Sequence, residues 1–161
     1  MIAVSNEQRV MNIPIPLLRA VYRCAYTLLR AYWFIVQPQV RGALALLIHA
    51  DQLLLVRNTY GRRGWTLPGG MMKRSEEPEI AMRREVHEEV GITVDGLQLI
   101  GVFNGRQAQR RDTIYIFAAQ IPHPAIQIDP GEILEARWFP LADLPPVSTY
   151  TRRALALWRS K

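Results

Sequence analysis

The sequence predicts an α/β protein, an α/β/α sandwich around a mixed sheet, with an extra helix at the N-terminus. Apolar, β-prone runs stand before and after one central helical segment, and another long helical segment precedes them all. With 161 residues, 49% of them hydrophobic, the chain is long enough to bury the core of one domain. We expect an N-terminal extension over residues 1–38 and the domain over residues 39–161.

The segment from Leu17 to Val36 predicts the first helix, because it is mostly apolar and aromatic and is bracketed by prolines. Arg19, Arg23 and Arg30 would fall within about 40° of one another on this helix and form a narrow basic stripe. Three arginines disfavour a transmembrane span. We expect the apolar surface of the helix to be buried on the domain or in a homodimer, and in-plane contact with an anionic membrane is the alternative.

The strands are predicted from apolar, β-prone runs separated by polar residues. Residues 42–49 and 53–57 predict a hairpin, and residues 97–103 and 113–120 predict a second strand pair joined by a polar loop over 104–112. A short strand over residues 136–139 and a terminal helix over residues 151–159 follow.

The central helix is predicted over residues 76–90. Ser75 suits its N-cap, and Gly91 ends it. Met82 and Val86 lie four residues apart, so both should face the core.

Three glutamates give this helix its chemistry. Glu85, Glu88 and Glu89 stand at i, i+3 and i+4, so their carboxylates share one face and repel one another unless a cation is present. Mg²⁺ and Mn²⁺ prefer carboxylate oxygens and often bridge to substrate phosphates. The helix therefore predicts a metal site that meets phosphates, and a solvated acidic face is the alternative.

The segment from Gly70 to Ile92 resembles the Nudix box, G-x5-E-x7-R-E-U-x-E-E-x-G-U, in which U is a bulky aliphatic residue. All nine specified positions are met, which outweighs the alternative of a solvated acidic face. The nine are Gly70, Glu76, Arg84, Glu85, Val86, Glu88, Glu89, Gly91 and Ile92. With similar flanking segments, the resemblance covers about residues 40–146.

The resemblance implies a Nudix pyrophosphohydrolase, which hydrolyses a pyrophosphate bond in a nucleoside diphosphate linked to another moiety. The implied cofactor is Mg²⁺, with Mn²⁺ also suitable. The implied metal ligands are Gly70 through its carbonyl, Glu85, Glu88 and Glu89. The implied catalytic residues are Glu85, Glu88 and Arg84, of which Arg84 orients the carboxylates, and Glu76 anchors either Arg84 or the loop.

Roles outside the box are more open. The general base comes either from the box or from Glu132 or Glu135. The candidates for substrate contact are Arg57, Arg106, Arg110, Arg111 and Glu132, with an ordinary solvated surface as the alternative for each. His87 occupies an unspecified position of the box, and we expect it to be solvated.

The net charge and the cysteine content limit which partners and which cell compartment the sequence predicts. The net charge is +6, and residues 1–41 hold five arginines against one glutamate, a balance of +4. The alternative function is therefore a non-catalytic module that binds a nucleotide or RNA on the same fold. The retained carboxylates favour a nucleotide-derived small molecule over nucleic acid as the partner. Cys24 has no internal disulfide partner, and we expect it to be buried. The single cysteine and the lack of a recognisable signal peptide predict a cytoplasmic protein. The protein would be membrane-associated if the first helix binds lipid.

Overall fold

The protein is described by a computed structural model that covers residues 14–36, 39–61, 64–107 and 110–161, except for the side chains of residues 33–39 and 106–111. Its elements in chain order are α1 (Ile15–Val36), β1 (Gln39–His49), β2 (Gln52–Asn58), β3 (Gly69–Met71), α2 (Pro78–Val90), β4 (Gln98–Gln107), β5 (Arg110–Gln120), β6 (Ile133–Pro140) and α3 (Thr149–Arg159).

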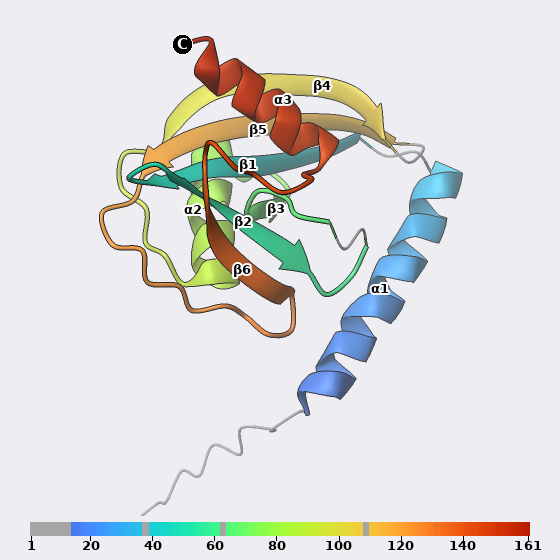
Figure 1. Cartoon of the computed structure of the whole chain (residues 1–161). Coiled ribbons are helices and arrows are strands. Elements are labelled where there is room, and N and C mark those ends of the chain that lie inside the picture. Colours follow the sequence, from blue (N-terminus) through green and yellow to red (C-terminus); the bar gives the residue numbers. More distant parts are fainter. Residues whose placement is uncertain (1–13, 37–38, 62–63, 108–109) are drawn as a thin grey trace, which may run out of the picture.

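A mixed sheet forms the centre of the domain (Figure 1). The strand order is β4-β5-β1-β2-β6, and the short strand β3 also pairs with β1. Strands β1 and β5 run parallel, whereas the other pairs are antiparallel. Helices α2 and α3 cover opposite faces of the sheet. The predicted fold class is confirmed.

Each face of the sheet has its own apolar core. Leu47 on β1 packs in the core that contains Met82 and Val86 of α2. Its neighbour Leu46 packs in the opposite core, together with Leu155 of α3. Successive side chains of a strand point to opposite faces, which explains why residues 42–48 of β1 are apolar without interruption. The core that contains Met82 and Val86 fixes one face of α2 to the sheet, and the adjacent face of α2 carries the candidate site.

The start of α2 differs from the prediction. Ser75 is not the N-cap, because its φ of 62° places it in a left-handed turn two residues before the cap residue, Glu77. The helix begins at Pro78, a residue that suits the first turn of a helix. The Glu76 carboxylate accepts a hydrogen bond from the Lys73 backbone N–H at 2.8 Å, so the turn is closed before the helix starts. Gly91 ends α2 with a φ of 69°, as predicted.

The predicted polar loop over residues 104–112 is mostly strand. Pairing between β4 and β5 continues from Asn104 opposite Thr113 to Gln107 opposite Arg110. Strand β1 also lies parallel to β5 from Gln39 onward, so the polar residues of β5 have backbone partners on both sides. This tertiary pairing overrides their low intrinsic strand propensity.

Helix α1 lies beside the domain, off both faces of the sheet (Figure 1). Its basic stripe meets the domain, where the Arg19 and Arg23 side chains donate to backbone carbonyls of Pro130 and Thr59. Its apolar face points outward, with Leu17 56% and Leu28 72% exposed. The expectation that the apolar face would be buried on the domain is therefore wrong. The loop carbonyls are polar, and the arginine side chains satisfy them better than leucines would.

Cys24 is exposed on α1, which corrects the expectation that it would be buried. Within the described ranges, none of the helices is long and apolar enough to cross a bilayer.

Candidate metal and catalytic site

Helix α2 presents its glutamates at different depths. Glu89 is almost fully buried at 1% exposure, and Glu85 is buried at 9%. Glu88 lies one position before Glu89 and is exposed to solvent. The three carboxylates therefore run from the core of the protein to its surface along one side of the helix.

Strand β3 approaches this side of α2 closely because it starts with two glycines. The Gly69 backbone N–H donates a hydrogen bond to Oε2 of Glu89 at 2.8 Å. The φ of Gly69 is 135°, and a Cβ there would collide with the backbone of β1. A Cβ on Gly70 would collide with the carboxylate of Glu85. Glycine at position 69 is therefore required by the backbone, and glycine at position 70 leaves the space that the Glu85 carboxylate occupies.

Arg84 connects the other carboxylates. Its Nε and Nη2 donate to the two oxygens of Glu76, each at 2.9 Å, which is a bidentate pair. Its Nη1 donates to Glu85 at 2.7 Å and to Glu88 at 2.9 Å. Arg84 thus holds three carboxylates in fixed directions, and Glu76 is its bidentate partner.

The electrostatics of this cluster follow from its contacts. The bond from Arg84 lowers the pKa of Glu76 to about 2, and the bonds to Glu76 and Glu85 raise the pKa of Arg84 although burial opposes this. Burial raises the pKa of Glu85 despite the Arg84 bond, and it raises the pKa of Glu89 further because Glu89 has only the Gly69 N–H to offset its desolvation. The buried end of the cluster therefore lacks positive charge.

Glu132 joins the same electrostatic site although it lies far away in the sequence. Burial raises the pKa of Glu132, and the negative charges of Asp129 and Glu88 raise it further. The backbone N–H of Asp129 donates to the carbonyl of Glu89 at 3.1 Å, and the N–H of Thr59 donates to the carbonyl of Glu132 at 2.8 Å. These bonds hold the segment before β6 between α2 and the end of β2.

The donor chemistry suits a hard divalent cation. Oxygens of Glu85 and Glu88 converge on one nitrogen of Arg84, so both carboxylates point toward the same positive charge. In the described part of the chain, no three His, Cys, Asp or Glu side chains are arranged to hold a metal ion as they stand. Three carboxylates on one side of α2, two of them buried and Glu88 exposed, nevertheless provide the oxygen ligands that Mg²⁺ prefers. The residues that could hold a metal are Glu85, Glu88 and Glu89, beside the backbone of Gly70.

The remaining sequence-predicted residues lie outside this cluster or beyond description. Glu135 pairs with Arg57 at 3.1 Å and also with Arg137, so its charge is neutralised locally. Arg57 further lies over the ring of Trp65, 5.5 Å from the centroid. His87 is exposed, as expected. The backbone of Arg106, Arg110 and Arg111 belongs to the β4–β5 hairpin, and their side chains lie outside the described residues.

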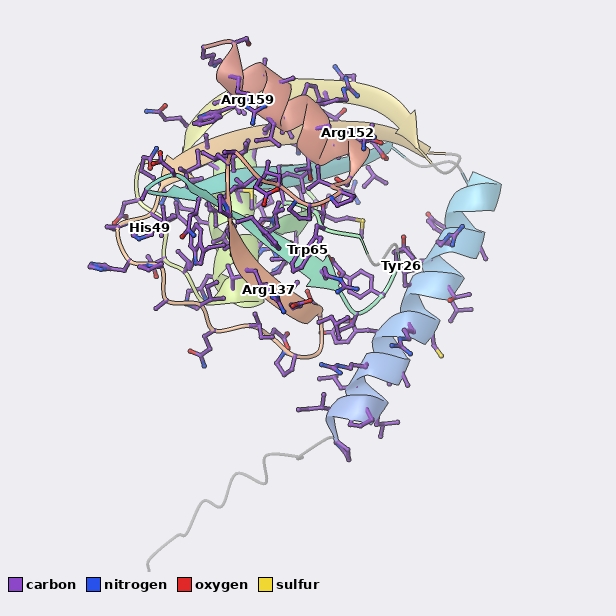
Figure 2. All side chains as sticks on the ribbon, in the orientation of Figure 1. Tyr26, His49, Trp65, Arg137, Arg152 and Arg159 are labelled. Atoms are coloured by element: carbon purple, nitrogen blue, oxygen red, sulfur yellow. The ribbon has the colours of Figure 1, made fainter. Side chains whose placement is uncertain are left out.

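Sequence reasoning missed an aromatic cluster beside Glu132. The ring of Tyr60 lies 6.2 Å from that of Tyr22 and 5.3 Å from that of Tyr26, both on α1. Figure 2 shows Tyr26 projecting from α1 toward the domain. Burial first, and then the charge of Glu132, raise the pKa of Tyr60. The helical spacing of Tyr22 and Tyr26 was the available signal, but the sequence does not show that their partner follows β2.

The model of the NUDIX domain family matches residues 38–158 of the chain. The chain belongs to the Nudix family. Among curated proteins, it is 36% identical over 123 residues to the NAD-capped RNA hydrolase NudC of Citrobacter koseri and to that of Shigella flexneri. Each match covers 73% of this chain and 47% of the relative, so the chain spans about half the length of these curated relatives.

Solved structures of Nudix proteins share the fold. A MutT Nudix hydrolase from Burkholderia pseudomallei superposes with a TM-score of 0.68 at 27% identity, covering 74% of this chain and 97% of the other. The Nudix domain of Shewanella oneidensis NrtR, solved with ADP ribose, has a TM-score of 0.69 at 21% identity and covers 76% of this chain and 87% of its own. The second similarity concerns the fold alone.

Proposed function

We propose that the Nudix protein described here is a metal-dependent hydrolase that cleaves a pyrophosphate bond in a nucleoside diphosphate linked to another moiety. The observation that carries this proposal is the arrangement of the box, in which Arg84 gathers Glu76, Glu85 and Glu88 while Glu89 is held by Gly69. Mg²⁺, or Mn²⁺ in its place, would be held by Glu85, Glu88 and Glu89, with the Gly70 carbonyl as a further ligand. When bound, it supplies charge neutralisation at the phosphates and a water of lowered pKa.

The side chains of the protein have distinct tasks in this reaction. Arg84 fixes the directions of the Glu85 and Glu88 carboxylates, and Glu76 fixes Arg84. Glu132 is our candidate for the general base. Burial raises its pKa, which makes the carboxylate more basic, and it lies outside the ion pairs that neutralise Glu135. Arg57 and the hairpin arginines Arg106, Arg110 and Arg111 are candidates for contact with substrate phosphates.

The relatives guide the choice of substrate. Curated relatives bear the name NAD-capped RNA hydrolase, and a structural neighbour was solved with ADP ribose. NAD and ADP ribose both contain an adenosine diphosphate that is joined through its pyrophosphate to a second ribose. We therefore propose dinucleotides and ADP-linked sugars of this kind as the first substrates to test.

The test is a hydrolysis panel with and without Mg²⁺. NAD, ADP ribose, NAD-capped RNA and a nucleoside diphosphate sugar are incubated with the protein, and nucleoside monophosphate release is followed by chromatography. Mg²⁺-dependent release from at least one of them is expected, and the Glu88→Gln variant serves as the inactive control.

The charge of the chain supports a second candidate function. The net charge of +6 suits a module that binds a nucleotide or RNA without cleaving it. This candidate predicts no turnover on the panel together with RNA binding that is independent of metal. Retention of buried carboxylates argues against it, because they repel a polyanion unless a cation is present.

The outward face of α1 supports a proposal about partners. Leu17, Val21 and Leu28 are each more than half exposed, and their spacing places them on one side of the helix. We infer that this apolar stripe is covered by a second copy of the chain in a homodimer, with peripheral contact to an anionic membrane as the alternative. A cytoplasmic location, membrane-associated in the second case, is part of the same proposal.

A further inference from the structure

Helix α1 is docked on the segment that carries Glu132. The Arg19 Nε donates to the carbonyl of Pro130 at 2.9 Å. A Cβ built on Gly131 would lie 2.9 Å from a methyl carbon of Leu18 and 3.0 Å from the ring of Tyr22, so both side chains pack closely on this glycine. The residues immediately before Glu132 are therefore held by direct contact with α1.

The same helix also holds the end of β2. The Arg23 Nε donates to the carbonyl of Thr59 at 3.3 Å, and the rings of Tyr22 and Tyr60 are stacked with an interplanar angle of 14°. Thr59 in turn donates from its hydroxyl to the carbonyl of Gly131 at 2.7 Å and from its N–H to that of Glu132 at 2.8 Å. One turn of α1 thus fixes two loops that are themselves tied together around Glu132.

The Tyr22 side chain lies beside Glu132, because a carbon of its ring is 3.0 Å from the place of a Cβ on the preceding residue, Gly131. Burial first, and then the charge and hydrogen bonding of Glu132, raise the pKa of Tyr22 to about 12. The same hydrogen bond lowers the pKa of Glu132 against the larger effect of burial. At neutral pH the phenol is therefore a donor, and it favours the ionised carboxylate on the side of Glu132 that faces α1.

We propose that Tyr22 is a positioning residue for Glu132, so that helix α1, which lies outside the segment resembling the Nudix box, completes the active site. This inference rests on the proposed hydrolase function. In this proposal the phenol of Tyr22 restrains the Glu132 carboxylate, while its ring packs on Gly131 and Tyr60. A side chain that served packing alone would need only the ring.

The test separates the phenol from the ring. Tyr22→Phe keeps the ring and removes the donor, and Tyr32→Phe is the matched control, because Tyr32 lies on the same helix and is 51% exposed. Loss of a charge-assisted hydrogen bond from a reacting group lowers a rate by about tenfold or more. We expect Tyr22→Phe to lower kcat about tenfold with little change in KM, while the variant stays folded at the assay temperature, and Tyr32→Phe to behave as the wild type.

A double-mutant cycle with Glu132→Gln decides the mechanism. If Tyr22 acts through Glu132, Tyr22→Phe has no further effect on kcat in the Glu132→Gln background. Equal fold-losses in both backgrounds, or wild-type kcat for Tyr22→Phe or for Glu132→Gln, would overturn the proposal while leaving the hydrolase function intact. Absence of turnover by the wild-type protein on the whole substrate panel would overturn the hydrolase function and this proposal with it.

Discussion

Helices α1 and α2 both present a charged stripe toward the same site, but they are held in opposite ways. Helix α2 buries an apolar face, with Met82 and Val86 fully enclosed, and its acidic stripe lies beside that face. Helix α1 docks through its arginines and tyrosines and leaves Leu17 and Leu28 exposed.

The difference shows that amphipathic pattern alone does not orient a helix. The apolar face of α2 has the sheet opposite it, so hydrophobic burial decides its orientation. The partner of α1 is a pair of loops with outward carbonyls, and directional hydrogen bonds decide the orientation there. The two helices should therefore respond differently to substitution.

The largest effect is expected on α2. Glu88→Gln, or Glu89→Gln, should lower turnover by at least about a hundredfold with the fold intact, because it removes charge that stabilises the transition state through the metal. Steady-state hydrolysis with circular dichroism as the fold control measures this. Wild-type activity in both variants would refute the assignment of metal ligands.

A smaller effect on activity is expected when α1 is undocked. The double variant Arg19→Ala and Arg23→Ala loses both bonds to the loop carbonyls and should lower kcat several-fold, because the segment before Glu132 loses its support. Arg30→Ala is the matched control, since Arg30 is exposed on the same helix. If the double variant and the control were equally active, the docking of α1 would have no part in the reaction.

Metal binding should stabilise the α2 site. A ligand bound only by the native state adds about 2.7 kcal/mol at a concentration one hundred times its Kd. Millimolar Mg²⁺ should therefore raise the melting temperature of the wild type, and EDTA should reverse the rise. Glu88→Gln should respond less. An unchanged melting temperature throughout the titration would argue against metal binding by these carboxylates.

Without metal, the buried Glu89 should make stability depend on pH. Its folded-state pKa is raised well above the value of about 4.3 expected in the unfolded chain, so the native state binds more protons than the unfolded state between these two values. The free energy of unfolding therefore falls as pH rises through this range. Glu89→Gln should flatten this decline in EDTA-treated protein, as measured by urea unfolding from pH 4 upward. A decline as steep as that of the wild type would show that Glu89 is not its source.

The smallest effect on activity is expected from the outward face of α1. Leu28→Gln should leave kcat unchanged, because Leu28 is 72% exposed and makes no part of the site. It should weaken the proposed homodimer, which analytical ultracentrifugation detects. The membrane alternative would be favoured instead if the wild-type protein were monomeric and bound anionic vesicles in a salt-sensitive way, and if Leu28→Gln abolished that binding.

The sequence by itself determined the local part of the site. The box spacing, the helical repeat that turns Met82 and Val86 inward, and Gly91 as the end of α2 depend on residues close to one another in the chain, so periodicity and cap chemistry suffice to predict them. The link between Glu76 and Arg84 is equally local, since eight positions separate them. The resemblance to the Nudix box implied it as one of two alternatives, and the structure shows the bond.

Tertiary structure alone decided the rest. Ser75 is a reasonable N-cap by residue type, but the turn is closed by Glu76, and strand β3 and the long β4–β5 hairpin exist only because β1 supplies their backbone partners. The orientation of α1 and the meeting of Tyr22 with Glu132 depend on contacts between segments more than one hundred residues apart. Such contacts depend on which backbone carbonyls remain accessible after the helices and strands have packed. That accessibility is a property of the assembled backbone, so a local sequence pattern does not predict it.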